Sequence, residues 1–182
     1  MLKEIGKKAL LAAEELKTID TDTKNKVLND MASELINDAD EIIDANKIDL
    51  ENAKQLGLTA ALTDRLTLNK ERIQGMSDGL KKIIRLEDPV GKVTESWTSD
   101  DGLNINKVRS PFGVIGIIYE ARPNVTSDVS GLCLKSGNAC ILRGGSEAAN
   151  SNAVIEDCMQ KGLEKASLPK HSIQLIKNQD RK

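Results

Sequence analysis

The fold is decided by residues 113–143. Two short apolar runs, Gly113-Val114-Ile115-Gly116-Ile117-Ile118-Tyr119 and Ala139-Cys140-Ile141-Leu142-Arg143, flank a stretch with helical character over roughly Thr126 to Ser136, which ends at Gly137. Both runs are short and rich in β-branched residues, as buried strands are. Continuous apolar strands that alternate with helices indicate a parallel sheet covered by helices on both faces.

The same alternation continues towards the C-terminus. Gly144 and Gly145 turn the chain, Ser146 is placed to cap a helix that runs to about Lys165, and residues 172–176 form a third apolar run. A doubly wound nucleotide-binding sheet usually has about five or six strands. Residues 178–182 are too few to supply the next helix. We therefore expect this chain to be the front part of a larger α/β protein, with an unpaired strand near its end.

Residues 1–88 are expected to be helical almost throughout, because apolar residues recur at helical spacing between lysines and glutamates. The expected helices are one over residues 2–16, one capped by Thr21 or Thr23, one capped by Asp38 and ended by Gly57, and one that begins near Asn69. We interpret this region as helical packing with solvated charged faces. Acidic residues near Asp38 are typical of a helix first turn rather than of a metal site.

Residues 89–110 have the pattern of a β-hairpin. Two β-like runs, Lys92 to Ser99 and Leu103 to Arg109, are separated by Asp100-Asp101-Gly102. An Asp-Gly pair between alternating runs is a strong hairpin signal.

Composition excludes several classes of protein. With 26 Lys and Arg against 28 Asp and Glu, the formal net charge of −2 argues against a broad grip on nucleic acid or anionic lipid. A single histidine, His171, makes a two-histidine zinc helix or a Ser-His-Asp triad improbable. No apolar run approaches the length of a membrane span. Cys133, Cys140 and Cys158 match no metal or disulfide spacing, so we expect inert core thiols in a reducing, cytoplasmic setting.

The end of the second apolar run is the better candidate for an anion site. Arg143 supplies a permanent charge, and Gly144 and Gly145 allow close backbone approach. Ser146 would open a helix whose free N–H groups favour negative charge, and Glu147 could accept from ribose hydroxyls. The five residues together suit a ribose that carries a phosphate. The alternative is a glycine turn with an incidental arginine.

The end of the first apolar run offers Arg122, which could hold a carboxylate or a phosphate. The alternative is a surface ion pair between Arg122 and Glu120. No G-x-G-x-x-G sequence follows this run, so any nucleotide would need a docking mode other than the usual dinucleotide fingerprint.

Two long segments carry a resemblance to a known family. Residues 110–126, SPFGVIGIIYEARPNVT, and residues 135–148, KSGNACILRGGSEA, closely resemble the corresponding segments of γ-glutamyl phosphate reductases, also called glutamate-5-semialdehyde dehydrogenases. The helical N-terminus, Asp64-Arg65-Leu66 and Asp88-Pro89-Val90-Gly91 fit that family as well. The family belongs to the aldehyde dehydrogenase superfamily.

The resemblance implies an α/β fold in which N-terminal helices and a β-hairpin lead into an incomplete Rossmann-like parallel sheet, as in aldehyde dehydrogenases. Residues 1–88 would be the helical region, residues 89–110 an oligomerisation-type extension of a possible homo-oligomer, and residues 111–182 the first part of an NADP-binding domain. The implied reaction is NADPH-dependent reduction of L-glutamyl 5-phosphate to L-glutamate 5-semialdehyde and phosphate, in cytoplasmic proline biosynthesis.

The resemblance also implies roles for particular residues. Residues Arg143 to Glu147 would hold the cofactor, with Arg143 suited to the 2′-phosphate of NADP, and Arg122 and Asn124 would face the substrate. The nucleophilic cysteine of the family lies beyond residue 182, so no catalytic residue is expected here and this chain alone is expected to be inactive. Two alternatives are a non-catalytic nucleotide-binding or assembly fragment and another aldehyde dehydrogenase subfamily.

Overall fold

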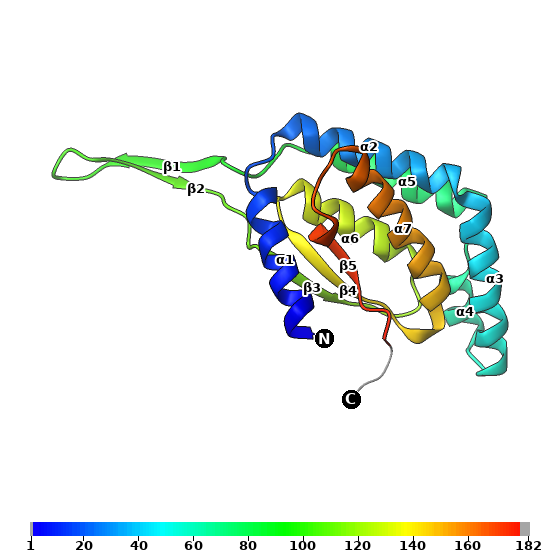
Figure 1. Ribbon diagram of the computed structural model, residues 1–182. Helices are drawn as coiled ribbons and strands as arrows, with labels where there is room; N and C mark the ends of the chain where they lie inside the picture. Colours follow the sequence, from blue (N-terminus) through cyan, green and yellow to red (C-terminus); the bar gives the residue numbers. More distant parts are fainter. Residues whose placement is uncertain (1, 179–182) are drawn as a thin grey trace.

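The computed structural model describes residues 2–178, and its elements form a helical N-terminal region, a hairpin and a small sheet (Figure 1). The N-terminal helices are α1 (Leu2–Leu16), α2 (Thr21–Asn37), α3 (Ala39–Gln55), α4 (Ala60–Leu66) and α5 (Lys70–Ile84). The hairpin consists of β1 (Val93–Thr98) and β2 (Asn104–Val108). The remaining elements are β3 (Val114–Ile118), α6 (Asn124–Lys135), β4 (Ala139–Arg143), the 3₁₀ turn η1 (Ser146–Ala148), α7 (Ala149–Lys165), the 3₁₀ turn η2 (Lys170–Ser172) and β5 (Ile173–Leu175).

The sheet confirms the expected α/β class. Strands β3, β4 and β5 are parallel and lie in that order, so that Ile115 is level with Cys140, and Cys140 with Ile173. Helix α1 packs on one face, where Gln174 Nε2 donates to the carbonyl of Ile5 at 3.2 Å. Helices α6 and α7, which connect the strands, cover the other face. The central strand β4 is therefore largely buried, which explains why its apolar run lacks polar alternation. The edge strand β3 is only partly buried, and its Ile118 is 82% exposed, so the expectation of a fully buried strand is wrong there.

One hydrophobic core joins the helical region to the sheet. It contains side chains from α1, α2, α5, α6 and α7 as well as from the strands. Gly162 of α7 lies against α2, because a Cβ there would come 3.0 Å from the backbone nitrogen of Met31 and would also meet the Met31 side chain. Only glycine permits this close approach of the two helices.

Asp38 is the N-cap residue of α3, as expected, but three details of the helices differ from the sequence interpretation. Asp20, rather than Thr21 or Thr23, caps α2, since its Oδ1 accepts from the Thr23 N–H at 2.7 Å while both threonines already lie inside the helix. Asp38 makes no cap bond to α3, because its carboxylate instead accepts from Lys161 Nζ at 2.6 Å. Helix α4 was not expected, and it is capped by Thr59 in a segment too short to display a clear apolar period.

The hairpin projects away from the rest of the molecule (Figure 1). Its strands pair antiparallel, with Trp97 opposite Ile105, and Gly102 has a positive φ of 84° in the connecting turn. The hairpin expected around Asp100-Asp101-Gly102 is thus confirmed. Every residue of both strands is exposed, including Trp97 at 49%.

The cysteines lie in the interior. Cys133, Cys140 and Cys158 are free and buried, and desolvation raises the pKa of the Cys158 thiol. Among residues 2–178, no group of three or more His, Cys, Asp or Glu side chains is arranged to hold a metal ion. None of the helices in that same range combines the length and the apolar character that a membrane crossing requires.

A buried ion pair fixes the segment that leads from α5 into the hairpin. Lys24 of α2 is 1% exposed, and its Nζ donates to Asp88 Oδ2 at 2.8 Å. Thr21 donates to the same carboxylate, and so does the Val90 N–H. Burial raises the pKa of Asp88, but these hydrogen bonds outweigh burial and hold that pKa below its ordinary value.

Asp88→Ala should lower the free energy of unfolding by about 3 kcal/mol at neutral pH, because it leaves the Lys24 ammonium buried without a partner. The pKa of Asp88 is lower in the folded than in the unfolded protein, so the carboxylate stabilises the fold fully above about pH 4 and less as the pH falls below that value. Urea unfolding between pH 7 and pH 3 measures both effects.

The matched control is Glu95→Ala, which breaks the exposed ion pair between Glu95 and Lys107. This variant should change the unfolding free energy far less, since exposed pairs contribute little. Two results would contradict a stabilising Lys24–Asp88 ion pair. One is an equal loss of unfolding free energy in the two variants, and the other is a difference in unfolding free energy between wild type and Asp88→Ala that does not shrink as the pH falls.

Candidate cofactor and substrate site

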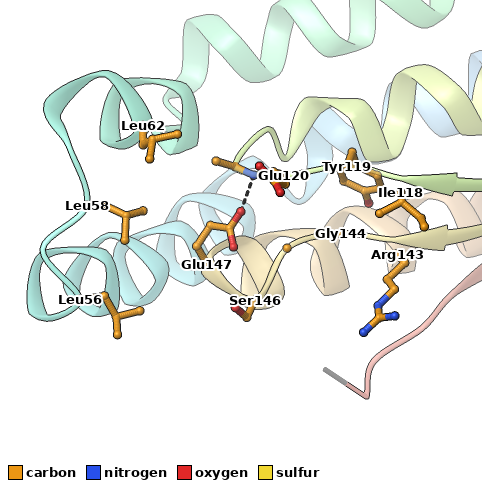
Figure 2. A pocket seen from close by; sticks show the side chains of 12 residues that line it. Leu56, Leu58, Leu62, Ile118, Tyr119, Glu120, Arg143, Gly144, Ser146 and Glu147 are labelled. Carbon is orange, nitrogen blue, oxygen red and sulfur yellow. Dashed lines mark hydrogen bonds between the residues drawn. The ribbon is translucent and has the colours of Figure 1, made fainter. Parts of the chain in front are cut away.

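The carboxyl ends of β3 and β4 open into a cavity of about 640 Å³. Figure 2 shows the turn after β4 on one side and three leucines, Leu56, Leu58 and Leu62, on the other. The structure brings all five residues of the predicted anion site, Arg143, Gly144, Gly145, Ser146 and Glu147, to the wall of this one cavity. Sequence reasoning missed the leucine wall. The available signal was a cluster of leucines around Gly57, outside any regular apolar period.

The glycine turn is packed against side chains of the protein itself. A Cβ on Gly144 would collide with the amide of Asn152, which is 1% exposed. Thr126 Oγ1 donates to Asn152 Oδ1 at 3.0 Å and lies 2.7 Å from the Tyr119 hydroxyl. A Cβ on Gly145 would meet the carboxylate of Glu147. The two glycines therefore let Asn152 and Glu147 approach the backbone of the turn.

Glu147 joins the ends of the two strands. Its Oε1 accepts from the Ala121 N–H at 2.6 Å, as the dashed line in Figure 2 marks. Ala121 has a positive φ of 35°, a conformation that a non-glycine residue adopts only at a cost. Among residues 2–178, no hydrogen bond to Glu147 Oε2 is present, so this oxygen is the one that can face a ligand.

The helix expected to begin at Ser146 begins later. Residues Ser146–Ala148 form a 3₁₀ turn without a side-chain cap, and α7 starts at Ala149. The reason lies in α3, where the buried carboxylate of Asp49 takes the capping role. Asp49 accepts from the Asn150 N–H at 3.2 Å, from the Ser151 N–H at 2.8 Å and from Ser151 Oγ at 2.6 Å. These N–H groups of α7 are consequently occupied within the protein and are not available to an anion.

Arg122 and Asn124 line a second cavity of about 380 Å³. Asp64, Arg65, Arg72 and Asp128 line it as well, and sequence reasoning had not assigned them a role. No ion pair between Glu120 and Arg122 is present among the described residues. Asn124 Nδ2 donates to Asp128 Oδ2 at 3.0 Å, and burial raises the pKa of Asp128. The two cavities adjoin the same turn, because Ala121 lines the first and Arg122 the second.

Comparison with known proteins identifies relatives along nearly the whole chain. A γ-glutamyl phosphate reductase from Halothermothrix orenii is 53% identical over 177 residues, which are 97% of this chain and 42% of that protein. One from Desulforamulus reducens is 48% identical over 180 residues, covering 99% of this chain and 43% of that protein. No protein family model matches the chain.

The solved structures that are similar to this chain include γ-glutamyl phosphate reductases as well. The crystal structure of γ-glutamyl phosphate reductase from Thermotoga maritima superposes with a TM-score of 0.95 at 45% identity, over 99% of this chain and 44% of that one. The chain is homologous to the N-terminal part of γ-glutamyl phosphate reductases. It spans less than half the length of the reductases it matches. A probable aldehyde dehydrogenase from Listeria monocytogenes, 15% identical with a TM-score of 0.70, shares the fold.

The packing of the glycine turn predicts different costs at its two glycines. Gly144→Ala should lower the free energy of unfolding by about 2 kcal/mol, because Asn152 is buried and held by Thr126 and cannot move aside. Gly145→Ala should cost about 1 kcal/mol, because the Glu147 carboxylate can move aside at the end of its side chain but then loses its hydrogen bond from the Ala121 N–H. Denaturant unfolding of both variants tests the order, and a larger loss at Gly145 would refute it.

Proposed function

We propose that this chain is the front part of a γ-glutamyl phosphate reductase that converts L-glutamyl 5-phosphate to L-glutamate 5-semialdehyde and phosphate with NADPH. This reaction would serve cytoplasmic proline biosynthesis. The observation that carries the proposal is the pair of adjoining cavities at the β3–α6 turn, one suited to a nucleotide and one lined by arginines. Homology to reductases of that name supports it.

The first cavity fits the adenosine end of a dinucleotide. Its leucine wall offers an apolar surface for a base, and Arg143 offers a forked cation for a 2′-phosphate. Glu147 can accept from ribose hydroxyls through its second carboxylate oxygen. Bound NADPH supplies the hydride for the reduction. The residues of this chain orient the cofactor, and the selectivity for NADPH over NADH would come from Arg143.

The reacting thiol would come from a part of the enzyme outside this chain. Family chemistry calls for a cysteine that attacks the acyl phosphate and releases phosphate, leaving a thioester for reduction. Cys133, Cys140 and Cys158 are 6%, 0% and 0% exposed, and none of them lines either cavity. This chain would bind and orient the two reactants rather than carry out the covalent step.

The hairpin supports a further part of the proposal, that the enzyme is a homo-oligomer. A two-stranded hairpin is at best marginally stable alone in water. Here no residue of either strand is buried, and the apolar side chains of Val93, Trp97, Ile105 and Val108 are 36% to 50% exposed. A second copy that covers this surface would bury the apolar side chains.

In the full-length enzyme, Arg143→Ala should raise the Kd for NADPH about tenfold or more and leave the Kd for NADH nearly unchanged. The reason is that only NADPH presents a 2′-phosphate for a charge-assisted hydrogen bond. Fluorescence titration of both cofactors measures the change. The control is Arg85→Ala, because Arg85 is an exposed arginine at the end of α5 and lies outside both cavities. A parallel loss of both cofactors would count against the 2′-phosphate role.

For the hairpin, Trp97→Ser combined with Ile105→Ser should shift the full-length enzyme towards smaller assemblies in multi-angle light scattering. These two residues are cross-strand neighbours, so the double variant removes two of the four apolar side chains of the strands. The control is Leu86→Ser, because Leu86 is an exposed leucine outside the hairpin. An unchanged mass in the double variant, or a wild-type enzyme that is already monomeric, would exclude assembly through the hairpin.

A further inference from the structure

The second cavity contains two cations without a partner in the described part of the chain. Arg72 is committed to the α4–α5 connection, since its Nη2 donates to Asp64 Oδ1 at 2.8 Å and its Nη1 to the carbonyl of Thr67 at 2.8 Å. Arg65 and Arg122 differ from it. Both are exposed and line the cavity, and within residues 2–178 neither guanidinium group forms an ion pair or a hydrogen bond. The cavity thus offers two forked donors to an anion.

The same cavity contains a carboxylate that is held in place. Asp128 of α6 lines it, and Asn124 Nδ2 fixes one carboxylate oxygen at 3.0 Å. Within residues 2–178 no cation pairs with Asp128, and burial disfavours its charged form. A cationic group of a ligand would restore the charge balance at this position.

We propose that the second cavity binds the amino-acid head group of the substrate, with Arg65 and Arg122 receiving the α-carboxylate and Asp128 receiving the α-ammonium. This inference rests on the proposed function and assigns one end of its substrate. Arginine matches the two oxygens of a carboxylate through paired N–H donors. A phosphate is a poorer match for the whole set, because the Asp128 carboxylate would repel a second anionic group.

Size and position agree with this assignment. About 380 Å³ holds a small molecule, and the cavity adjoins the cofactor cavity at Ala121-Arg122. A substrate anchored by its head group in the second cavity could extend its far end, where the acyl phosphate is, towards that shared turn. Arg65 and Arg122 would act as specificity-determining residues, and Asn124 as the positioning residue for Asp128.

The test compares two aldehydes in the full-length enzyme, assayed in the oxidative direction with NADP⁺ and phosphate. One is L-glutamate 5-semialdehyde, and the other is 5-oxopentanoate, which keeps the carboxylate and lacks the amino group. For each we would measure KM, or the competitive Ki where turnover is slow. Asp128→Asn should raise the value about tenfold for the semialdehyde and leave it unchanged for 5-oxopentanoate. Arg65→Gln and Arg122→Gln should raise the value about tenfold for both compounds.

The outcomes separate the inference from the proposed function. Arg85→Gln serves as the arginine control, and the Kd for NADPH should stay unchanged in every variant. Equal effects of Asp128→Asn on both compounds, or no effect on either, would overturn the assignment of the ammonium. Unchanged values in both arginine variants would overturn the assignment of the carboxylate. A wild-type enzyme that fails to oxidise L-glutamate 5-semialdehyde would instead refute the proposed function.

Discussion

The arrangement of both cavities depends on two buried polar side chains of α3, Asp49 and Asn46. Asp49 lies on α3, is 1% exposed, and receives two backbone N–H groups and a hydroxyl from the start of α7. A buried carboxylate without partners would cost several kcal/mol, so this contact must form whenever the core forms. One turn earlier, Asn46 donates to Ser151 Oγ at 3.0 Å and to the carbonyl of Leu66 at 2.9 Å. Through these two side chains α3 holds both the turn after β4, which lines the first cavity, and the α4–α5 connection, which lines the second.

Much of the fold could be predicted because its apolar patterns are local and continuous. The runs at residues 113–119 and 139–143 contain the strands β3 and β4, and the Asp-Gly signal at Asp101-Gly102 is a hairpin turn. The errors fall where a distant residue decides the local structure. Ser146 has the sequence context of a cap, but Asp49, about a hundred positions earlier, takes that role. Asp38 likewise gives up its cap to an ion pair with Lys161. These contacts join residues that are far apart in the sequence, so the local sequence pattern cannot predict them.

The candidate site shows the same division between local and distant information. Arg143 to Glu147 are contiguous, so a glycine turn after a strand was enough to group them. Arg122 and Asn124 were also recognised, but their surroundings were not, because Arg65 and Asp128 come from different helices. Asn124 donates a hydrogen bond to Asp128, one helical turn away. Its amide therefore supports a carboxylate, whereas the sequence interpretation had it facing a ligand. The local sequence pattern identifies the charged residues. Which of them pair with one another, and which remain to contact a ligand, depends on residues from distant helices.

The bond between Glu147 and Ala121 explains why the two cavities remain adjacent. The two residues are 26 positions apart, and their 2.6 Å contact ties the turn after β4 to the turn after β3. The strained backbone of Ala121 persists because this hydrogen bond and its burial hold it there. In the proposed reaction, hydride transfer would require the cofactor and the substrate to meet within a few ångströms, so two separately built cavities would need a rigid common wall. Ala121 and Arg122 form that wall, each facing one cavity. A glutamate that served only a ribose would not need to reach across to the turn after β3. Under the proposed function, Glu147 would therefore have a second role, which is to set the distance between the two ligands.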